Sequence, residues 1–140
     1  MKYLIKNGTV INEGKIEQQD ILLENNLITK IGKDISEASA TIIDAADKYI
    51  IPGIIDDQVH FREPGLTHKA SIYTESKAAI AGGVTSFMEQ PNTKPSALTQ
   101  ELLEEKYQIA AQTSLANYTF FMGTSNDNYD EVMKTNFSKV

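Results

Sequence analysis

The pattern of apolar residues changes at Pro52-Gly53, and this change constrains the fold more than any other feature. Before it, short apolar runs rich in β-branched residues alternate with turn signals, which is typical of strands. After it, short apolar runs alternate with longer segments whose apolar residues recur every three to four positions, which is typical of helices. We therefore expect a β region over residues 1–51 and an α/β region over residues 52–140.

The β region is expected to form a small antiparallel unit that could be part of a β-sandwich. Asn7-Gly8 is a strong hairpin dipeptide, and Asn25-Asn26 tolerates the left-handed backbone of a tight turn. The expected short strands lie at Tyr3–Ile5, Val10–Ile11, Ile21–Leu23, Leu27–Ile31, Ile42–Ile43 and Tyr49–Ile51.

The α/β region is expected to alternate parallel strands with helices. Strands are expected at Ile54–Phe61, Val84–Met88 and Tyr118–Met122, and helices at Ile72–Ala81, after the capping residue Thr99, and from Tyr129. A closed (β/α)₈ barrel takes about 250 residues. The region holds only about three βα units, so we expect either part of such a barrel or an open sheet.

Composition narrows the classes of function. No apolar stretch approaches the roughly 20 residues of a membrane span, and Met1–Lys6 does not resemble a secretory signal. The chain has no cysteine, which fits the cytoplasm. Its net charge of −6 makes nucleic acid an unlikely partner. We therefore expect a cytoplasmic protein that binds neither membrane nor nucleic acid.

The segment 56–65 carries most of the candidate chemistry. It ends the first strand of the α/β region, and sites of α/β folds form at the carboxyl ends of strands. Strand alternation predicts that Asp56, Gln58 and His60 share one face. A neutral imidazole at His60 could bind zinc, with a carboxylate orienting it. The alternative, which spacing alone favours, is a strand histidine with an ordinary hydrogen-bond partner.

Two further polar residues follow strand ends. Arg62 could bind a substrate carboxylate through two hydrogen bonds, or it could be a surface arginine paired with Glu63 or Asp57. Asn92 could donate from its amide at the same rim, or it could be an ordinary turn residue. Rim positions 126–128 and the loop residue His68 are equally well explained as surface groups.

Together these segments resemble the dihydroorotases of the cyclic amidohydrolase superfamily. Pro52–Gly65 is similar to their opening barrel strand, Ala78–Thr85 to their first helix and second strand, and Pro91–Pro95 to the segment that ends that strand. Residues 1–51 resemble the family's N-terminal part of a β-sandwich. The resemblance implies an α/β fold made of about the first three βα units of an amidohydrolase TIM barrel, preceded by part of a small β-sandwich.

The resemblance also implies a chemistry. Zinc would activate water and polarise the cyclic amide of dihydroorotate, which opens to carbamoyl aspartate in pyrimidine synthesis. His60 is then a zinc ligand, and Arg62 and Asn92 hold the substrate carboxylate. The family has histidine at the position of Gln58, whose amide oxygen binds zinc poorly. The remaining ligands and the acid/base aspartate are expected beyond Val140, so the 140 residues alone should be inactive. The resemblance also allows a homodimer.

Two alternative functions stay open. Gln58 favours a non-catalytic dihydroorotase-like scaffold, although such a protein would have no use for Arg62 and Asn92. A cyclic amidohydrolase of the allantoinase or hydantoinase type would share the fold and differ in substrate.

Overall fold

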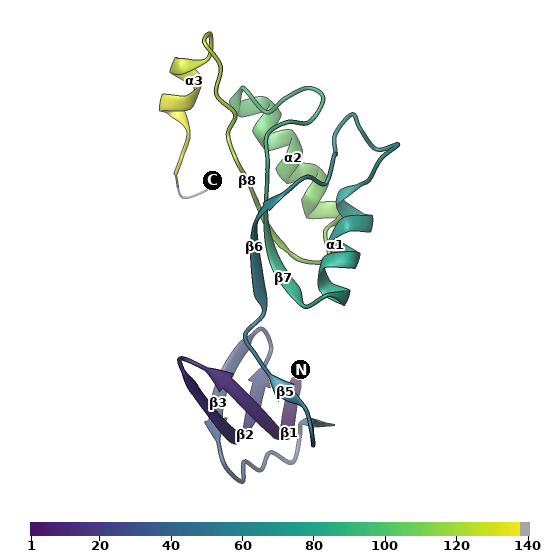
Figure 1. Ribbon diagram of the computed structural model, residues 1–140, viewed down its shortest axis with the longest axis vertical. Coiled ribbons are helices and arrows are strands. Elements are labelled where there is room, and N and C mark those ends of the chain that lie inside the picture. Colours follow the sequence, from purple (N-terminus) through teal and green to yellow (C-terminus); the bar gives the residue numbers. More distant parts are fainter. Residues whose placement is uncertain (138–140) are drawn as a thin grey trace. The chain divides into compact units, whose positions relative to one another are not determined.

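The computed structural model describes residues 1–137 and separates into two compact units (Figure 1). We call Met1–Pro52 the β unit and Gly53–Val140 the α/β unit. The expectation of an α/β protein is confirmed. The longest helix described has 14 residues, and no helix within residues 1–137 has the length and apolar character needed to cross a membrane.

The β unit is one five-stranded sheet of order β3-β2-β1-β4, with β5 also paired to β1. The expectation of an all-antiparallel unit was wrong, because β4 and β5 run parallel to β1. Parallel neighbours need a crossover connection, and residues 33–40 carry the chain from one edge of the sheet to the other. The strands are β1 (Lys2–Asn12), β2 (Lys15–Glu24), β3 (Leu27–Gly32), β4 (Thr41–Asp44) and β5 (Tyr49–Ile50).

The hairpin expected at Asn7-Gly8 is absent from the structure, because β1 runs straight through it. The register of β1 against β2 shifts between Ile5 and Gly8, which marks a β-bulge. Asn7 has a left-handed backbone with φ of 65°. One class of bulge uses such a residue, as tight hairpin turns also do, and the chain reverses later, at Glu13-Gly14. The turn at Asn25-Asn26 is confirmed, and Asn25 is left-handed with φ of 56°.

The α/β unit contains a parallel sheet of order β6-β7-β8. Helices α1 and α2 pack against each other, against β7 and β8 respectively, and lie on the same side of the sheet (Figure 1). The expected alternation of strands and helices is confirmed. The elements are β6 (Ile54–Val59), α1 (Ile72–Ala81), β7 (Val84–Glu89), α2 (Gln100–Thr113), β8 (Asn117–Phe120) and α3 (Tyr129–Lys134).

Local signals fix both long helices. The Ser71 hydroxyl accepts the N–H of Thr74 at the start of α1, and the Thr74 side chain accepts the N–H of Ser71 in return. The Thr99 hydroxyl accepts the N–H of Leu102 at the start of α2. Such caps satisfy N–H groups that have no partner within the helix.

An aromatic cluster forms the core of the α/β unit. The rings of Phe61 and Phe87 lie 4.4 Å apart, and Tyr107 meets Phe120 edge-on at 5.0 Å. Leu103 and Ala110 of α2 pack on the same core. Phe61 belongs to the segment after β6, so this packing anchors the chain where the candidate residues begin.

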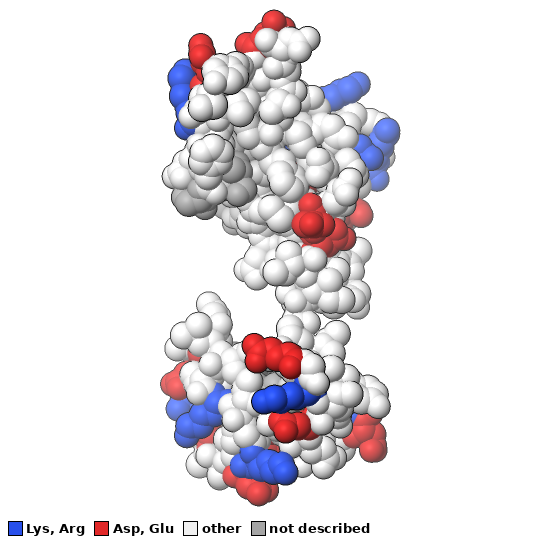
Figure 2. Space-filling model, turned by 60° about the vertical axis from the view of Figure 1, so that its left-hand side comes forward, with Lys and Arg blue, Asp and Glu red and all other residues white. Residues whose placement is uncertain are grey.

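Charged groups on the β unit are interleaved rather than gathered by sign. On the face drawn in Figure 2, blue and red side chains alternate along this unit. Lys2 lies 3.5 Å from both Glu24 and Glu37, and Lys6 lies 3.4 Å from Asp20. Opposite charges are therefore neutralised locally.

Candidate active site

The candidate residues gather where the parallel strands end. His60 and Arg62 follow β6, and Asn92 follows β7. The N–H of Gln90 donates to the Val59 carbonyl at 3.0 Å, which holds the two strand ends together. The sheet thus brings together residues 30 or so positions apart in the chain.

His60 has a defined partner. Its Nδ1 lies 3.0 Å from Oδ1 of Asn92. An amide oxygen only accepts hydrogen bonds, so this bond requires the proton on Nδ1. The lone pair of Nε2 is then available to a metal ion. The partner that orients His60 is an amide, where the sequence suggested a carboxylate.

Asp56 and Gln58 do not join this pair. Oδ1 of Asp56 accepts the N–H of Gln58 at 3.1 Å, and Gln58 is exposed. The pairing of β6 with β7 shifts register between Asp56 and Val59, which interrupts the alternation that predicted a shared face. Within residues 1–137, no group of three or more His, Asp or Glu side chains is placed to hold a metal ion.

Arg62 is the only arginine in the sequence. Its backbone is left-handed, with φ of 72°, and its N–H donates to Oε1 of Glu89 at 3.0 Å. The alternative pairing with Glu63 is not seen, because Oε2 of Glu63 accepts the N–H of Ile72 at 2.8 Å. Within residues 1–137, the guanidinium of Arg62 has no hydrogen-bond or ion-pair partner, so it is available to an anion.

Glu89 and Lys106 form a buried ion pair beneath these residues. Oε2 of Glu89 lies 3.0 Å from Nζ of Lys106, and each side chain is 1% exposed. The ammonium also donates to the Gln90 carbonyl at 3.0 Å and lies 4.8 Å from the centre of the Phe120 ring. Burial raises the pKa of Glu89 and lowers the pKa of Lys106, and the attraction between the two charges opposes both shifts.

Sequence reasoning missed this pair, although two signals were present. Glu89 is two residues beyond the buried Phe87 on β7, so strand alternation places both on one face. Lys106 is three residues after Leu103 and four before Ala110, so helical spacing places it on the buried side of α2. A charged residue at such positions must find a buried partner.

The loops after β6 and β7 are joined to each other. The N–H of Lys94 donates to the Pro64 carbonyl at 3.2 Å. Gly65 has φ of +80°, and a Cβ there would collide with the carbonyl oxygen of Lys94. This close approach requires glycine, and it fixes the loop of Arg62 against the loop of Asn92.

Two other polar groups are explained without a site. Asn128 is buried, and its Nδ2 donates to the carbonyls of Leu98 and Gly123 at 2.9 Å, so it links loops at the same end of the unit. His68 is exposed on its loop. Asn128 is therefore explained as a structural residue, and His68 as an ordinary surface residue.

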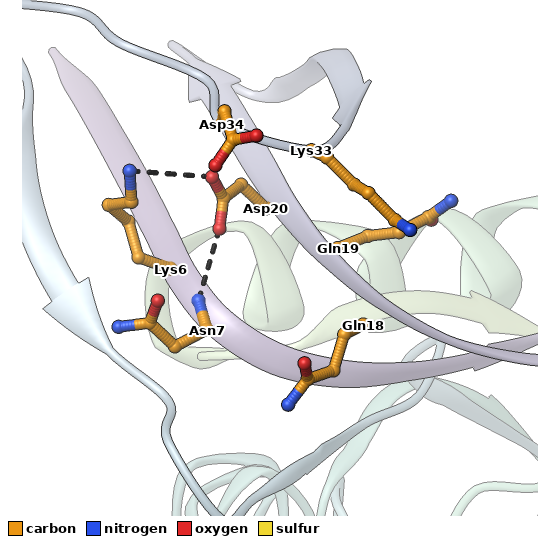
Figure 3. Close-up of a pocket in the computed structure, with 7 residues that line it drawn as sticks. All are labelled: Lys6, Asn7, Gln18, Gln19, Asp20, Lys33 and Asp34. Atoms are coloured by element: carbon orange, nitrogen blue, oxygen red, sulfur yellow. Dashed lines mark hydrogen bonds and ion pairs between the residues drawn. The ribbon is translucent and has the colours of Figure 1, made fainter.

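A polar hollow of about 240 Å³ lies in the β unit (Figure 3). Its central group is Asp20, which accepts the N–H groups of Asn7 and Ile35 at 3.0 Å each and lies 3.4 Å from Nζ of Lys6. These bonds satisfy the carboxylate within the unit. The hollow therefore reflects how Asp20 holds the bulge of β1, and nothing in it points to a ligand.

Solved structures share this architecture. L-hydantoinase (dihydropyrimidinase) from Arthrobacter aurescens matches with a TM-score of 0.89 at 28% identity, over 94% of this chain and 30% of that chain. Dihydropyrimidinase from Brevibacillus agri matches with a TM-score of 0.82 at 29% identity, over 95% of this chain and 29% of that one. The fold and the polar strand ends thus define a segment of the cyclic amidohydrolase class.

Comparison of the sequence with known proteins identifies the family within this class. Residues 47–135 match the family described as dihydro-orotase-like, and the chain belongs to this family. Similar proteins include the dihydroorotases of Lactococcus lactis (46% identity over 79% of this chain) and Trichlorobacter lovleyi (42% over 89%). The chain spans 26% and 30% of their lengths, about a quarter of the curated relatives that it matches.

Proposed function

We propose that the natural protein carrying this sequence is a dihydroorotase. It would hydrolyse the cyclic amide of dihydroorotate and close the ring of carbamoyl aspartate in the reverse direction, in pyrimidine synthesis. The observation that carries the proposal is the contact of His60 with Asn92 at adjacent strand ends, with Arg62 two residues after His60, in a chain whose relatives are dihydroorotases.

Arg62 and Asn92 account for the choice of substrate. A guanidinium binds a carboxylate through two charge-assisted hydrogen bonds. Oδ1 of Asn92 is taken by His60, which leaves its Nδ2 to donate to the same carboxylate. Dihydroorotate carries that carboxylate, whereas hydantoin and dihydrouracil lack it. The pair therefore favours dihydroorotate over the substrates of the hydantoinase type.

Zinc is the cofactor in this proposal. His60 fits one ligand position through Nε2, whereas Gln58 offers only a weakly binding amide oxygen. A catalytic zinc needs three protein ligands, so residues 1–137 supply an incomplete set, and the other ligands and the acid/base aspartate are expected beyond Val140. When bound, zinc lowers the pKa of water and polarises the carbonyl under attack. The chain's own share is to orient His60 and to hold the substrate carboxylate.

The whole fold is also part of the proposal. Residues 1–51 would be the N-terminal part of a β-sandwich, and residues 52–140 the N-terminal part of a (β/α)₈ barrel. The order β6-β7-β8 fits such a barrel, because each strand is added beside the last. A doubly wound sheet can reverse its direction of growth only after its third strand, so the choice of the barrel rests on the relatives. A cytoplasmic location and a homodimer remain expectations, and light scattering of the natural protein would test the second.

The test is dihydroorotate hydrolysis by the natural protein, with zinc content determined on the same sample. We expect turnover with bound zinc, which would show that Gln58 is tolerated. Folded, metal-free protein without turnover would contradict the proposal and favour the scaffold function that Gln58 suggests. Hydrolysis of hydantoin or dihydrouracil in preference to dihydroorotate would favour the hydantoinase type.

A further inference from the structure

We propose that Glu89, neutralised by Lys106, is a positioning residue for the substrate carboxylate. Its Oε1 holds the main-chain N–H of Arg62 and so fixes the left-handed residue from which the guanidinium extends. The inference rests on the proposed function, because it concerns the same carboxylate site.

The backbone of Arg62 needs such support. A left-handed backbone costs a non-glycine residue roughly 1–2 kcal/mol, and surrounding bonds must hold it in place. Both neighbouring peptide groups are held. The N–H of Arg62 donates to Glu89 at 3.0 Å, and its carbonyl accepts the N–H of Leu66 at 3.0 Å. Leu66 lies in the same loop as Arg62, whereas Glu89 lies on strand β7.

Lys106 extends the support to the second residue of the site. Its ammonium lies 3.0 Å from Glu89 and donates to the Gln90 carbonyl at 3.0 Å. Gln90 is two residues before Asn92. The ion pair thus contacts the main chain at Arg62 and at Gln90, close to both residues that we assign to binding of the substrate carboxylate. A purely structural pair would need only to satisfy its own charges, and this one also holds the N–H of Arg62.

Two double variants of the natural protein separate positioning from stability. Glu89→Leu with Lys106→Met, and Glu89→Gln with Lys106→Met, both remove the two charges at similar side-chain volume. Replacing both members of a buried pair by apolar groups is often tolerated. The variants differ in one respect: only glutamine at position 89 can still accept the N–H of Arg62.

We expect the Leu/Met variant to raise KM for dihydroorotate about tenfold while kcat changes much less, as loss of uniform substrate binding does. The Gln/Met variant should keep a KM close to that of the unmodified protein. The second readout is hydrogen exchange of the Arg62 amide, measured by mass spectrometry. Exchange should be faster in the Leu/Met variant and unchanged in the Gln/Met variant.

The two readouts must move together. Folded variants with equal KM values, or with equal exchange at Arg62, would overturn the proposal. If the Leu/Met variant does not fold, Glu89→Asp keeps both charges and withdraws the acceptor by about one C–C bond, roughly 1.5 Å. It should also raise KM and speed exchange, and unchanged values would overturn the proposal. If the unmodified protein does not turn over dihydroorotate, the proposed function fails and the role toward the substrate carboxylate fails with it, while exchange at Arg62 still shows whether Glu89 holds its backbone.

Discussion

Asp20 in the β unit and Glu89 in the α/β unit hold the backbone in the same way in different surroundings. Each carboxylate accepts the N–H of a left-handed residue that is not glycine, Asn7 with φ of 65° and Arg62 with φ of 72°. Each also pairs with a lysine. The side chain of Lys6 is 30% exposed, whereas that of Lys106 is 1% exposed.

The difference in burial changes the electrostatics. Burial raises the pKa of both carboxyl groups. At Asp20 the N–H groups of Asn7 and Ile35, together with Lys6, outweigh the effect of burial, and the pKa of Asp20 falls below its ordinary value. At Glu89 burial prevails and the pKa rises. The Asp20 carboxylate is therefore stable as a charge largely through backbone donors, whereas that of Glu89 depends on Lys106.

The largest expected effect is that of Lys106→Met. It leaves the Glu89 carboxylate buried without its counter-charge, and breaking a buried pair in this way costs about 3–5 kcal/mol. The matched variant Lys6→Met removes a partly exposed partner and should cost no more than about 1 kcal/mol. Urea denaturation of the natural protein measures both free energies of unfolding. Equal losses would show that burial does not distinguish the two pairs.

Asp20→Asn is expected to have an intermediate effect. One of the two backbone N–H groups that face the carboxylate loses its acceptor, which costs about 1–3 kcal/mol. Because the folded pKa of Asp20 is lowered, its contribution to stability is full above the ordinary aspartate pKa of about 3.9 and is lost as pH falls through the folded pKa. The gap between Asp20→Asn and the unmodified protein should therefore narrow in acid. A gap that widens below pH 4 would contradict this account.

The smallest expected effects on folding come from glycine at the two left-handed positions. Glycine adopts positive φ readily but loses more chain entropy on folding. Asn7→Gly and Arg62→Gly should therefore each change the free energy of unfolding by no more than about 1 kcal/mol. Thermal melts of both variants would check this. A loss of several kcal/mol at either position would show that the side chain, rather than the backbone, supports the fold there.

The sequence predicted elements whose signals are local. Thr99 caps a helix, Asn25 makes a turn, and strands alternate with helices after Pro52. Asn7 shows the limit of such signals. Its residue type correctly indicates a left-handed backbone, but the same backbone serves a hairpin or a bulge, and the pairing of β1 with β2 decides between them.

The sequence predicted where the candidate residues lie along the chain, but not the contacts that they make. The positions of His60, Arg62 and Asn92 follow from strand ends, whereas the bond between His60 and Asn92 depends on how two strands align. The extra residue in β6 also removed Asp56 from the position that alternation gave it. Glu89 and Lys106 were overlooked because charged residues are normally exposed, and only their periodicity indicated burial.

The central claim is that Arg62 selects a substrate carboxylate, and the most direct test compares two substrates. The measurement is kcat/KM of the natural protein and of Arg62→Met for dihydroorotate and for dihydrouracil, which lacks the carboxylate. We predict that the substitution lowers kcat/KM for dihydroorotate about a hundredfold or more, the scale expected when a charged hydrogen-bonded pair loses one partner, and leaves that for dihydrouracil nearly unchanged. Equal losses for both substrates, or no loss for dihydroorotate, would contradict the claim.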